Sequence, residues 1–406
     1  MSQANGSTAT RTVTIVGAGI AGLTAAISCA ESGCDVLLVE AHSALGGRAR
    51  SSDGDYQTNL GPHVLYKDGP FWPWMAERKL LPRSAGVPLA GAKLRWHGEI
   101  RRTPPLGSIV SALRLRGRKA PVEMDFRSWA TEHTGERTAA MLSAAAGVFT
   151  FHHDPGELSA AFVWPRSVRI LLSPPPAARY VIGAWNPLIA SLEQHARRLG
   201  VKIETKRRVE ALPPPPVILA TELGEARRLL SDPTLDWMSG HTVCIDLGLR
   251  HRRGDPFIVS DLDEAGWVER FSAADHTLAP DGEELVQAQM PVRPDERVEQ
   301  ATARLEQLLD ACLPDWRERQ TWHRRQVMHG RTGALDMPGT GWRDRPGVDR
   351  GDGVYLAGDM TAAPGLLSEV AWASAIEASR LVVQAAAAGP AAAHRTSRAT
   401  ESPARV

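Results

Sequence analysis

A glycine-rich turn near the amino end constrains the fold of this chain more than any other feature. Residues 17–22 read Gly-Ala-Gly-Ile-Ala-Gly, directly after the β-branched run Thr12–Val16 and before a helical stretch of small residues that ends at Gly33. Val36–Val39 then has the apolar composition of a second buried parallel strand. Glycines at this spacing permit a tight turn and the close approach of a pyrophosphate to a helix start. The sequence therefore predicts a strand–helix–strand unit that binds a dinucleotide.

An acidic residue supports this interpretation and restricts the type of dinucleotide. Glu40 follows the second predicted strand, where a carboxylate accepts hydrogen bonds from ribose hydroxyls and disfavours a 2′-phosphate. NADP is therefore not expected at this site. The alternative is a glycine-rich packing turn without a ligand. The predicted cofactor contacts in this region are Gly17, Gly19, Ile20, Ala21, Gly22, Glu40 and Ala41.

A second motif follows at once and indicates a flavin dinucleotide. Residues 45–50 read Leu-Gly-Gly-Arg-Ala-Arg, and here the chain resembles the FAD-dependent amine oxidase and phytoene desaturase superfamily. The resemblance implies that Gly46 and Gly47 pass close to FAD and that Arg48 approaches its diphosphate. Arginine suits this role because its planar guanidinium matches phosphate geometry. A surface cation in a turn is the alternative for Arg48.

The carboxyl-terminal part resembles the closing motif of the same superfamily. Residues 351–360 read Gly-Asp-Gly-Val-Tyr-Leu-Ala-Gly-Asp-Met and precede a Pro-Gly turn and a predicted helix over residues 366–387. The resemblance implies that Asp359 holds the ribityl or diphosphate part of FAD, and that N–H groups after Gly365 face the flavin ring. A helix N-terminus stabilises the negative charge of a reduced flavin. A helix cap is the alternative for Asp359. The predicted contacts are Gly358, Asp359, Gly365, Leu366 and Leu367.

Two middle segments complete the predicted flavin domain. Val217–Thr221 resembles a strand of the superfamily, and Val201–Val209 alternates like a strand and adds Val209 to the predicted cofactor contacts. The expected fold is α/β, with an FAD-binding Rossmann-type domain around a parallel sheet and a second, α+β substrate domain. The flavin domain would comprise residues 1–70, 178–240 and 345–385, the substrate domain residues 71–177 and 241–344, and a disordered tail residues 386–406.

Composition argues against several other classes of protein. Lys and Arg number 47 and Asp and Glu 46, so the net charge of +1 argues against nucleic-acid binding. Four cysteines without a C-x-x-C motif argue against a disulfide scaffold and a structural zinc site. His152 and His153 follow a predicted helix. Because neighbouring residues on a helix point in different directions, we expect no metal site there.

The expected location is cytoplasmic. The first residues lack the basic and hydrophobic regions of a secretory signal, and the longest uncharged stretch, Thr12–Ala30, contains the glycine turn. Leu106–Lys119 is a basic amphipathic stretch that suits peripheral contact with a membrane surface, although a solvent-facing helix is the favoured alternative. The sequence does not indicate an oligomeric state.

The resemblance implies a reaction in which a flavin takes hydride from a small organic substrate. Classical amine oxidases of the superfamily place a lysine near the flavin ring, but this chain has no lysine after Lys206. Residues 363–367, Ala-Pro-Gly-Leu-Leu, lack the aromatic cage of those enzymes and resemble phytoene-desaturase-like proteins. We therefore expect desaturation or dehydrogenation of an apolar, isoprenoid or polyketide-like secondary metabolite, with oxygen or a quinone as electron acceptor. A flavin amine oxidase and a redox-neutral, FAD-dependent isomerase or cyclase are the alternatives.

A short segment after the second motif supplies the catalytic candidates. By resemblance it passes near the flavin ring, which adds Gly61, Pro62 and His63 to the predicted cofactor contacts. His63 is the first candidate for proton transfer, because an imidazole titrates near neutral pH. Tyr66 is the second candidate. The alternatives are a structural histidine bonded to the backbone and a core tyrosine.

Overall fold

The computed structural model describes residues 12–88 and 90–388. These residues form two compact units, each built from separated segments of the chain. The first unit takes in the described residues of Met1–Gly47, Ala190–Asp236 and Pro346–Val406, and the second consists of Arg48–Ile189 and Trp237–Arg345. The predicted flavin domain also included residues 48–70, 178–189, 237–240 and 345, which group with the second unit in the structure.

A five-stranded parallel sheet forms the centre of the first unit. Its order is β15-β9-β1-β2-β8, and all neighbouring strands run parallel. The strands are β1 (Thr12–Val16), β2 (Asp35–Val39), β8 (Lys202–Glu204), β9 (Val217–Leu219) and β15 (Val354–Leu356). The predicted Rossmann-type start and the α/β fold class are confirmed. The predicted strand Val201–Val209 is too long, because pairing with β2 stops at Glu204.

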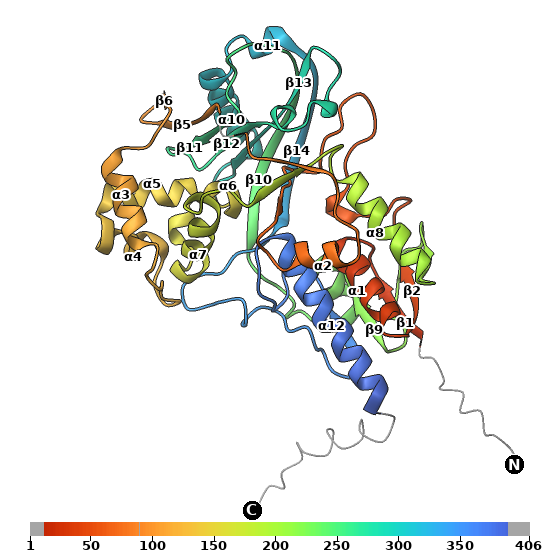
Figure 1. Ribbon diagram of the computed structural model, residues 1–406. Coiled ribbons are helices and arrows are strands. Elements are labelled where there is room, and N and C mark those ends of the chain that lie inside the picture. The colour runs from red at the N-terminus through yellow and green to blue at the C-terminus, as the bar shows by residue number, and fades with distance from the viewer. Residues whose placement is uncertain (1–11, 89, 389–406) are drawn as a thin grey trace, which may run out of the picture. The chain divides into compact units, whose positions relative to one another are not determined.

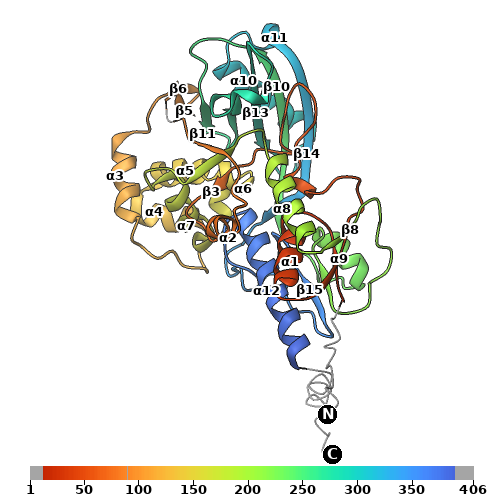
Figure 2. The ribbon, with the colours of Figure 1, turned by 45° about the vertical axis from the view of Figure 1, so that its right-hand side comes forward.

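Two helices from opposite ends of the chain pack together in the first unit. α1 (Ile20–Glu31) connects β1 to β2, and α12 (Ser368–Ala388) lies beside it in both views (Figures 1 and 2). Ser379 on α12 donates a hydrogen bond to the carbonyl oxygen of Ala25 at 3.3 Å. Because α12 extends to Ala388, residues 386–388 of the expected disordered tail are helical. Residues 389–406 of that tail lie outside the described residues.

A seven-stranded sheet forms the centre of the second unit, in the order β14-β10-β13-β12-β11-β5-β6. All neighbours are antiparallel except the parallel pair β11 and β5. α10 (Val298–Cys312) packs on one face against alternate apolar residues such as Val243, Ile245 and Leu247. The strands are β5 (Ala92–Trp96), β6 (Glu99–Arg101), β10 (Ser239–Arg250), β11 (Ile258–Asp261), β12 (Trp267–Arg270), β13 (Glu283–Pro291) and β14 (Gln320–Ala334).

A group of helices forms a second core in this unit. Phe126, Trp129 and Trp164 pack together at its centre, with ring centroids 5.4 to 6.3 Å apart. The helices are α3 (Leu106–Leu115), α4 (Phe126–Thr134), α5 (Glu136–Ala145), α6 (Gly147–Thr150) and α7 (Ala160–Leu171). Among the described residues, no helix is both long and apolar enough to cross a membrane.

The remaining elements are short. β3 (Leu65–Tyr66), β7 (Ala178–Val181) and β4 (Ser84–Gly86) form a small sheet in the second unit. The other helices are α2 (Phe71–Glu77), α8 (Asn186–Arg198), α9 (Leu223–Leu230) and α11 (Trp316–Arg319). Of these, α9 packs on β9 and β15 in the first unit.

Candidate functional site

The turn between β1 and α1 has space only for glycine at two positions. Gly17 has a φ of +98°, and a Cβ atom there would lie 2.5 Å from the carbonyl oxygen of Ala220. A Cβ atom at Gly22 would lie 1.8 Å from the carbonyl oxygen of Gly17. Residues 20–21 form the buried first turn of α1, and Gly19 before them supplies no side-chain cap. The first N–H groups of the helix are therefore suited to bind a phosphate.

Glu40 lies beside this turn, directly after β2. Its side chain is 7% exposed. Oε2 accepts a hydrogen bond from the Ala18 N–H at 2.8 Å, and Oε1 accepts one from the His42 N–H at 2.9 Å. The neighbouring Ala41 is exposed. The carboxylate thus fixes the glycine turn from the position that a ribose-binding acid takes in dinucleotide folds.

The second glycine motif packs against the same turn. The Gly46 N–H donates to the carbonyl oxygen of Ala18 at 2.7 Å, and Gly46 forms a parallel bridge with Gly19. A Cβ atom at Gly47 would lie 3.5 Å from the Cα atom of Gly19. The first unit therefore brings the glycine turn, Glu40 and the Gly46-Gly47 motif together.

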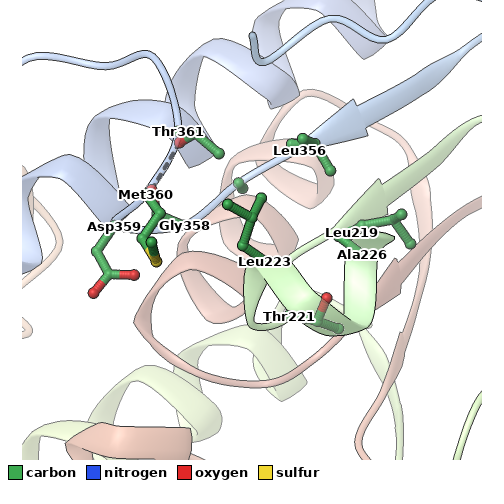
Figure 3. A pocket seen from close by; sticks show the side chains of 10 residues that line it. Leu219, Thr221, Leu223, Ala226, Leu356, Gly358, Asp359, Met360 and Thr361 are labelled. Carbon is green, nitrogen blue, oxygen red and sulfur yellow. Dashed lines mark hydrogen bonds between the residues drawn. The ribbon is translucent and has the colours of Figure 1, made fainter. Parts of the chain in front are cut away.

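The closing motif lies at the carboxyl end of β15. The Gly358 N–H donates to Ser374 Oγ at 2.9 Å, and the Thr361 hydroxyl donates to the carbonyl oxygen of Gly358 at 2.7 Å. Asp359 follows directly and borders a pocket at the ends of β9 and β15 (Figure 3). Because the ends of parallel strands are where such sheets bind ligands, Asp359 is placed to contact one. The lining residues are Leu219, Thr221, Leu223, Ala226, Leu356, Ala357, Gly358, Asp359, Met360 and Thr361.

The segment before α12 has a closely packed glycine. Gly365 has a φ of +129°, and a Cβ atom there would lie 2.8 Å from the Cβ atom of Glu369. The Leu366 N–H, which the resemblance assigns to the flavin ring, donates to Glu369 Oε2 at 3.0 Å. Leu367 has a φ of +52°, and α12 begins after it. This N–H is therefore engaged within the first unit.

Val209 lies in the loop between β8 and β9. Its side chain is partly buried against the core that α9 shares with β9. Its carbonyl oxygen accepts a hydrogen bond from Arg228 at 2.8 Å. These contacts are structural, and the predicted contact of Val209 with a cofactor stays a prediction.

The remaining predicted cofactor contacts belong to the second unit. Arg48 Nη1 donates to the carbonyl oxygen of Arg331 at 2.8 Å. A Cβ atom at Gly61 would lie 3.0 Å from Met328 Cε. His63 lies between two backbone carbonyls, with Nε2 2.9 Å from that of Arg48 and Nδ1 3.1 Å from that of Pro62.

These contacts give His63 the arrangement of a backbone-bonded histidine. Burial lowers its pKa, so its neutral form is favoured. Tyr66 is 9% exposed on β3, and the guanidinium of Arg169 lies 5.1 Å from its ring centroid. Proton transfer by His63 or Tyr66 stays a prediction.

One face of the large sheet carries a set of buried and partly buried polar side chains that we did not predict. Residues that lie directly opposite each other on paired strands point to the same face. The register places Arg324, Asp246, Gln287 and Glu269 in one row across four strands, and Gln326, Cys244, Gln289 and Trp267 in the next. These eight residues are called the polar face below. The alternation of polar and apolar residues in β10 and β13 was the sequence pattern that could have indicated this face.

Asp246 is the centre of a hydrogen-bond network on the polar face. It is 1% exposed. Its Oδ2 atom accepts from Arg324 Nε at 2.8 Å and from Gln326 Nε2 at 3.0 Å, and its Oδ1 atom accepts from Gln287 Nε2 at 2.9 Å. Arg324 also donates to the carbonyl oxygen of Asn59 at 2.6 Å. Burial raises the pKa of Asp246, while Arg324 opposes that rise.

Glu269 has a different environment in the same row. The hydroxyl of Tyr180 donates to its Oε1 atom. Burial raises the pKa of Glu269 to about 7, and the Tyr180 hydrogen bond opposes this rise. Burial also raises the pKa of Tyr180 well above its ordinary value. Glu269 is therefore a buried carboxyl group that changes charge near neutral pH.

The side chains of His152 and His153 lie closer together than we expected from the sequence. They follow α6 on a turn, after Phe151 in the left-handed conformation, and their ring centroids are 4.3 Å apart. His153 Nε2 lies 3.7 Å from Glu157 Oε2. One ligand atom of each of these three residues lies within 4.8 Å of the others. The expected divergence of the histidines is wrong because they are not on a helix. The absence of a metal site stays a prediction.

The fold and the glycine-turn geometry define a class: a protein with a Rossmann-type unit and a mixed-sheet second unit. Residues 15–77 match the NAD(P)-binding Rossmann-like domain, and residues 260–383 match the flavin containing amine oxidoreductase family. Over these two segments the chain is similar to flavin-containing amine oxidoreductases. No curated protein matches the chain in sequence.

Solved structures share the fold over nearly the whole chain. An oxidoreductase from Methanosarcina mazei has a TM-score of 0.72 and 16% identity, covering 90% of this chain and 99% of that one. Cyclohexylamine oxidase from Brevibacterium oxydans has a TM-score of 0.69 and 14% identity, covering 93% and 99%. A putative protoporphyrinogen oxidase from Exiguobacterium has a TM-score of 0.66 and 14% identity, covering 92% and 98%. These similarities establish the fold, and they do not single out a phytoene-desaturase-like branch.

Proposed function

We propose that the first unit binds FAD and that the enzyme oxidises an organic substrate by hydride transfer to the flavin. The observation that carries this proposal is the convergence of three motifs. Ala18 in the glycine turn donates its N–H to Glu40 and accepts a hydrogen bond from Gly46 through its carbonyl oxygen. The glycine turn, Glu40 and the Gly46-Gly47 motif are separate in sequence but lie together in the first unit. Such an arrangement suits the diphosphate and ribose groups of a dinucleotide.

The residues of the first unit suit FAD by shape and charge. Side chains at Gly17 and Gly22 would collide with backbone atoms, so both positions require glycine. Without side chains there, a pyrophosphate can approach the backbone of the turn. The start of α1 and the Gly46-Gly47 motif would hold the diphosphate, and Glu40 the ribose hydroxyls. Asp359 would hold the ribityl or diphosphate part. Bound FAD would supply a hydride acceptor, and the protein would position the substrate.

The substrate class is a separate part of the proposal. The sequence predicts an apolar metabolite, with oxygen or a quinone as electron acceptor, and this stays a prediction. Amine oxidation is the alternative. The polar face favours a substrate that forms hydrogen bonds, because a linear polyene would leave buried polar groups without partners.

Anaerobic flavin reduction tests the proposed function. The purified protein is expected to show the flavin absorption bands with about one FAD per chain. Candidate amines, alcohols and polyenes are then added separately without oxygen, and bleaching of the bands identifies the substrate class. A protein that remains colourless after incubation with FAD, although folded by circular dichroism, would refute the proposal.

We also propose that α3 contacts an anionic membrane surface. Three apolar side chains on this helix are exposed, namely Leu106 (78%), Val110 (45%) and Leu113 (48%), and basic residues follow them to Lys119. This combination suits the interface of anionic lipids. Cosedimentation with vesicles containing phosphatidylserine is expected, and Leu106→Ser with Leu113→Ser should abolish it. Equal binding by wild type and variant would exclude the role of α3.

A further inference from the structure

We propose that the polar face binds a polar substrate through Gln287, Gln289 and Trp267, and that this substrate is an amine or alcohol that also carries a carbonyl or carboxylate oxygen. The inference rests on the proposed function, because it names the substrate class of that oxidation. The inference goes beyond the proposed function because hydride transfer alone does not require a polar substrate.

Three polar atoms of this face have no hydrogen-bond partner among the described residues. They are Oε1 of Gln287, Nε2 of Gln289 and Nε1 of Trp267. The residues are 1%, 2% and 4% exposed, so bulk water does not cover these atoms. Buried polar groups in native proteins almost always have partners, because an unpaired one loses its hydration without compensation. A bound molecule that supplies the missing partners explains all three atoms together.

The register places the three atoms near one another. Gln289 lies directly opposite Trp267 on the neighbouring strand, and Gln287 is two residues from Gln289 on the same face of β13. Residues in these positions are neighbours on a sheet surface, and long side chains there reach one another. One small molecule can therefore contact all three.

The chemistry of the array fixes the type of ligand. The Asp246 carboxylate can only accept, so Gln287 must direct Nε2 to it, at 2.9 Å, and its Oε1 atom is left as an acceptor. Gln289 and Trp267 offer N–H donors. A ligand that fits presents an oxygen acceptor to these two donors and an N–H or O–H donor to Gln287. An amine or alcohol with a carbonyl or carboxylate oxygen has both groups, and a hydrocarbon polyene has neither.

The polar face is also connected to the chain segment that continues from the second glycine motif. Arg324 Nη2 and Gln287 Nε2 lie 2.6 Å and 3.5 Å from the carbonyl oxygen of Asn59. Asn59 lies in the same segment as Arg48, which directly follows Gly47. A ligand on the polar face would therefore lie close to Asn59 within the second unit.

The test uses the FAD-loaded enzyme and two substitutions that remove the proposed donors. Gln289→Leu and Trp267→Phe each remove an N–H group while leaving an apolar side chain. The matched controls are Gln307→Leu, on an exposed position of α10, and Trp164→Phe, in the helical core. L-serine, L-alaninamide and L-lactate are titrated without oxygen, and squalene in detergent serves as the apolar probe. Bleaching or perturbation of the flavin spectrum gives the dissociation constant.

At least one polar probe is expected to bind, and each test substitution should weaken it about tenfold, the effect of losing one hydrogen bond. The controls should leave binding within about twofold. Gln289→Leu should not lower the unfolding temperature, because it removes an unpaired buried N–H group and only a weak hydrogen bond from the Cys244 thiol. Binding of squalene alone, unchanged polar binding in both variants, or no polar binding by a protein that holds FAD would overturn the inference. A protein that holds no FAD would instead overturn the proposed function.

A crystal structure of the enzyme tests the same array without a known substrate. Ordered water or a ligand within hydrogen-bond distance of Gln287 Oε1, Gln289 Nε2 and Trp267 Nε1 is the expected result. Direct pairing of these atoms with other protein groups, or apolar side chains packed against them, would overturn the inference whatever the flavin content.

Discussion

The Oε2 atom of Glu40 accepts a hydrogen bond from the backbone N–H of Ala18, so this carboxylate holds the glycine turn directly. Glu40→Ala is expected to lower stability by about 1–3 kcal/mol, because it leaves the Ala18 and His42 N–H groups without their acceptor. It should also weaken FAD binding. Glu40→Gln keeps one acceptor oxygen and should lose less of both. Chemical denaturation and FAD titration of the two variants measure this order, and equal losses would contradict it.

Gly22 is the most restrictive position of the turn. Gly22→Ala places a Cβ atom 1.8 Å from the carbonyl oxygen of Gly17, so either α1 or the turn must move. The variant is expected to lose most of its flavin, measured as the ratio of flavin to protein absorbance. Gly107→Ala is the control, since nothing lies within 4 Å of its added methyl group. That control should keep its flavin, and full flavin in Gly22→Ala would show that the turn is not the binding loop.

The sequence predicted these positions because their requirements are local. Glycine spacing, a β-branched strand before it and an acid after it each depend on neighbours along the chain, and the structure has the same elements. Positions that depend on distant strands were predicted less well. Lys202–Glu204 pairs with β2, but the alternating pattern continues to Val209. The pattern alone therefore overestimated the length of this strand.

The titration of Glu269 should appear in the stability of the protein. Its folded pKa of about 7 lies above the ordinary value of 4.5, so the folded state binds its proton more tightly. The contribution of Glu269 to the free energy of unfolding is therefore highest at low pH. It falls by about 3 kcal/mol at most as the pH rises from about 4.5 to about 7. Glu269→Gln should remove this part of the pH dependence.

Denaturant unfolding at pH 5 and pH 7.5 measures the Glu269 effect. The free energy of unfolding of Glu269→Gln, relative to that of wild type, should be higher at pH 7.5 than at pH 5. Glu123→Gln, at an exposed position, should follow the wild-type curve. A constant difference between wild type and Glu269→Gln at both pH values would show that Glu269 does not titrate in this range.

Asp336 and Arg345 form a bidentate ion pair in the second unit, with both contacts at 2.8 Å. Their side chains are 4% and 1% exposed. Asp336→Asn should cost about 3–5 kcal/mol of stability, because it leaves the Arg345 charge buried without a counter-ion. The control is Asp232→Asn, whose partner Arg350 is more exposed, and which should cost much less stability. Similar losses in the two variants, measured by urea unfolding, would contradict the distinction.

The polar face shows why part of the candidate site escaped prediction. Asp246, Gln287 and Glu269 are far apart in sequence and become neighbours only through the register of β10, β13 and β12. Their strands contain so many apolar residues that composition alone indicates a buried sheet. The polar residues between them were readable as one face only once the pairing was known. The turn at His152 is a similar case, because a left-handed Phe151 lies between the end of α6 and the two histidines.

The strand order of the first unit has a consequence for how the protein is made. β1 ends at Val16, but β15, which completes the sheet on the far side of β9, begins only at Val354. At the usual rate of synthesis the ribosome needs roughly 20 to 70 seconds to cover that interval. The second unit ends at Arg345, so all of its residues are synthesised before β15 and α12. The unit that the chain begins is therefore the last to be finished, and its open sheet edge must be kept from foreign strands until then.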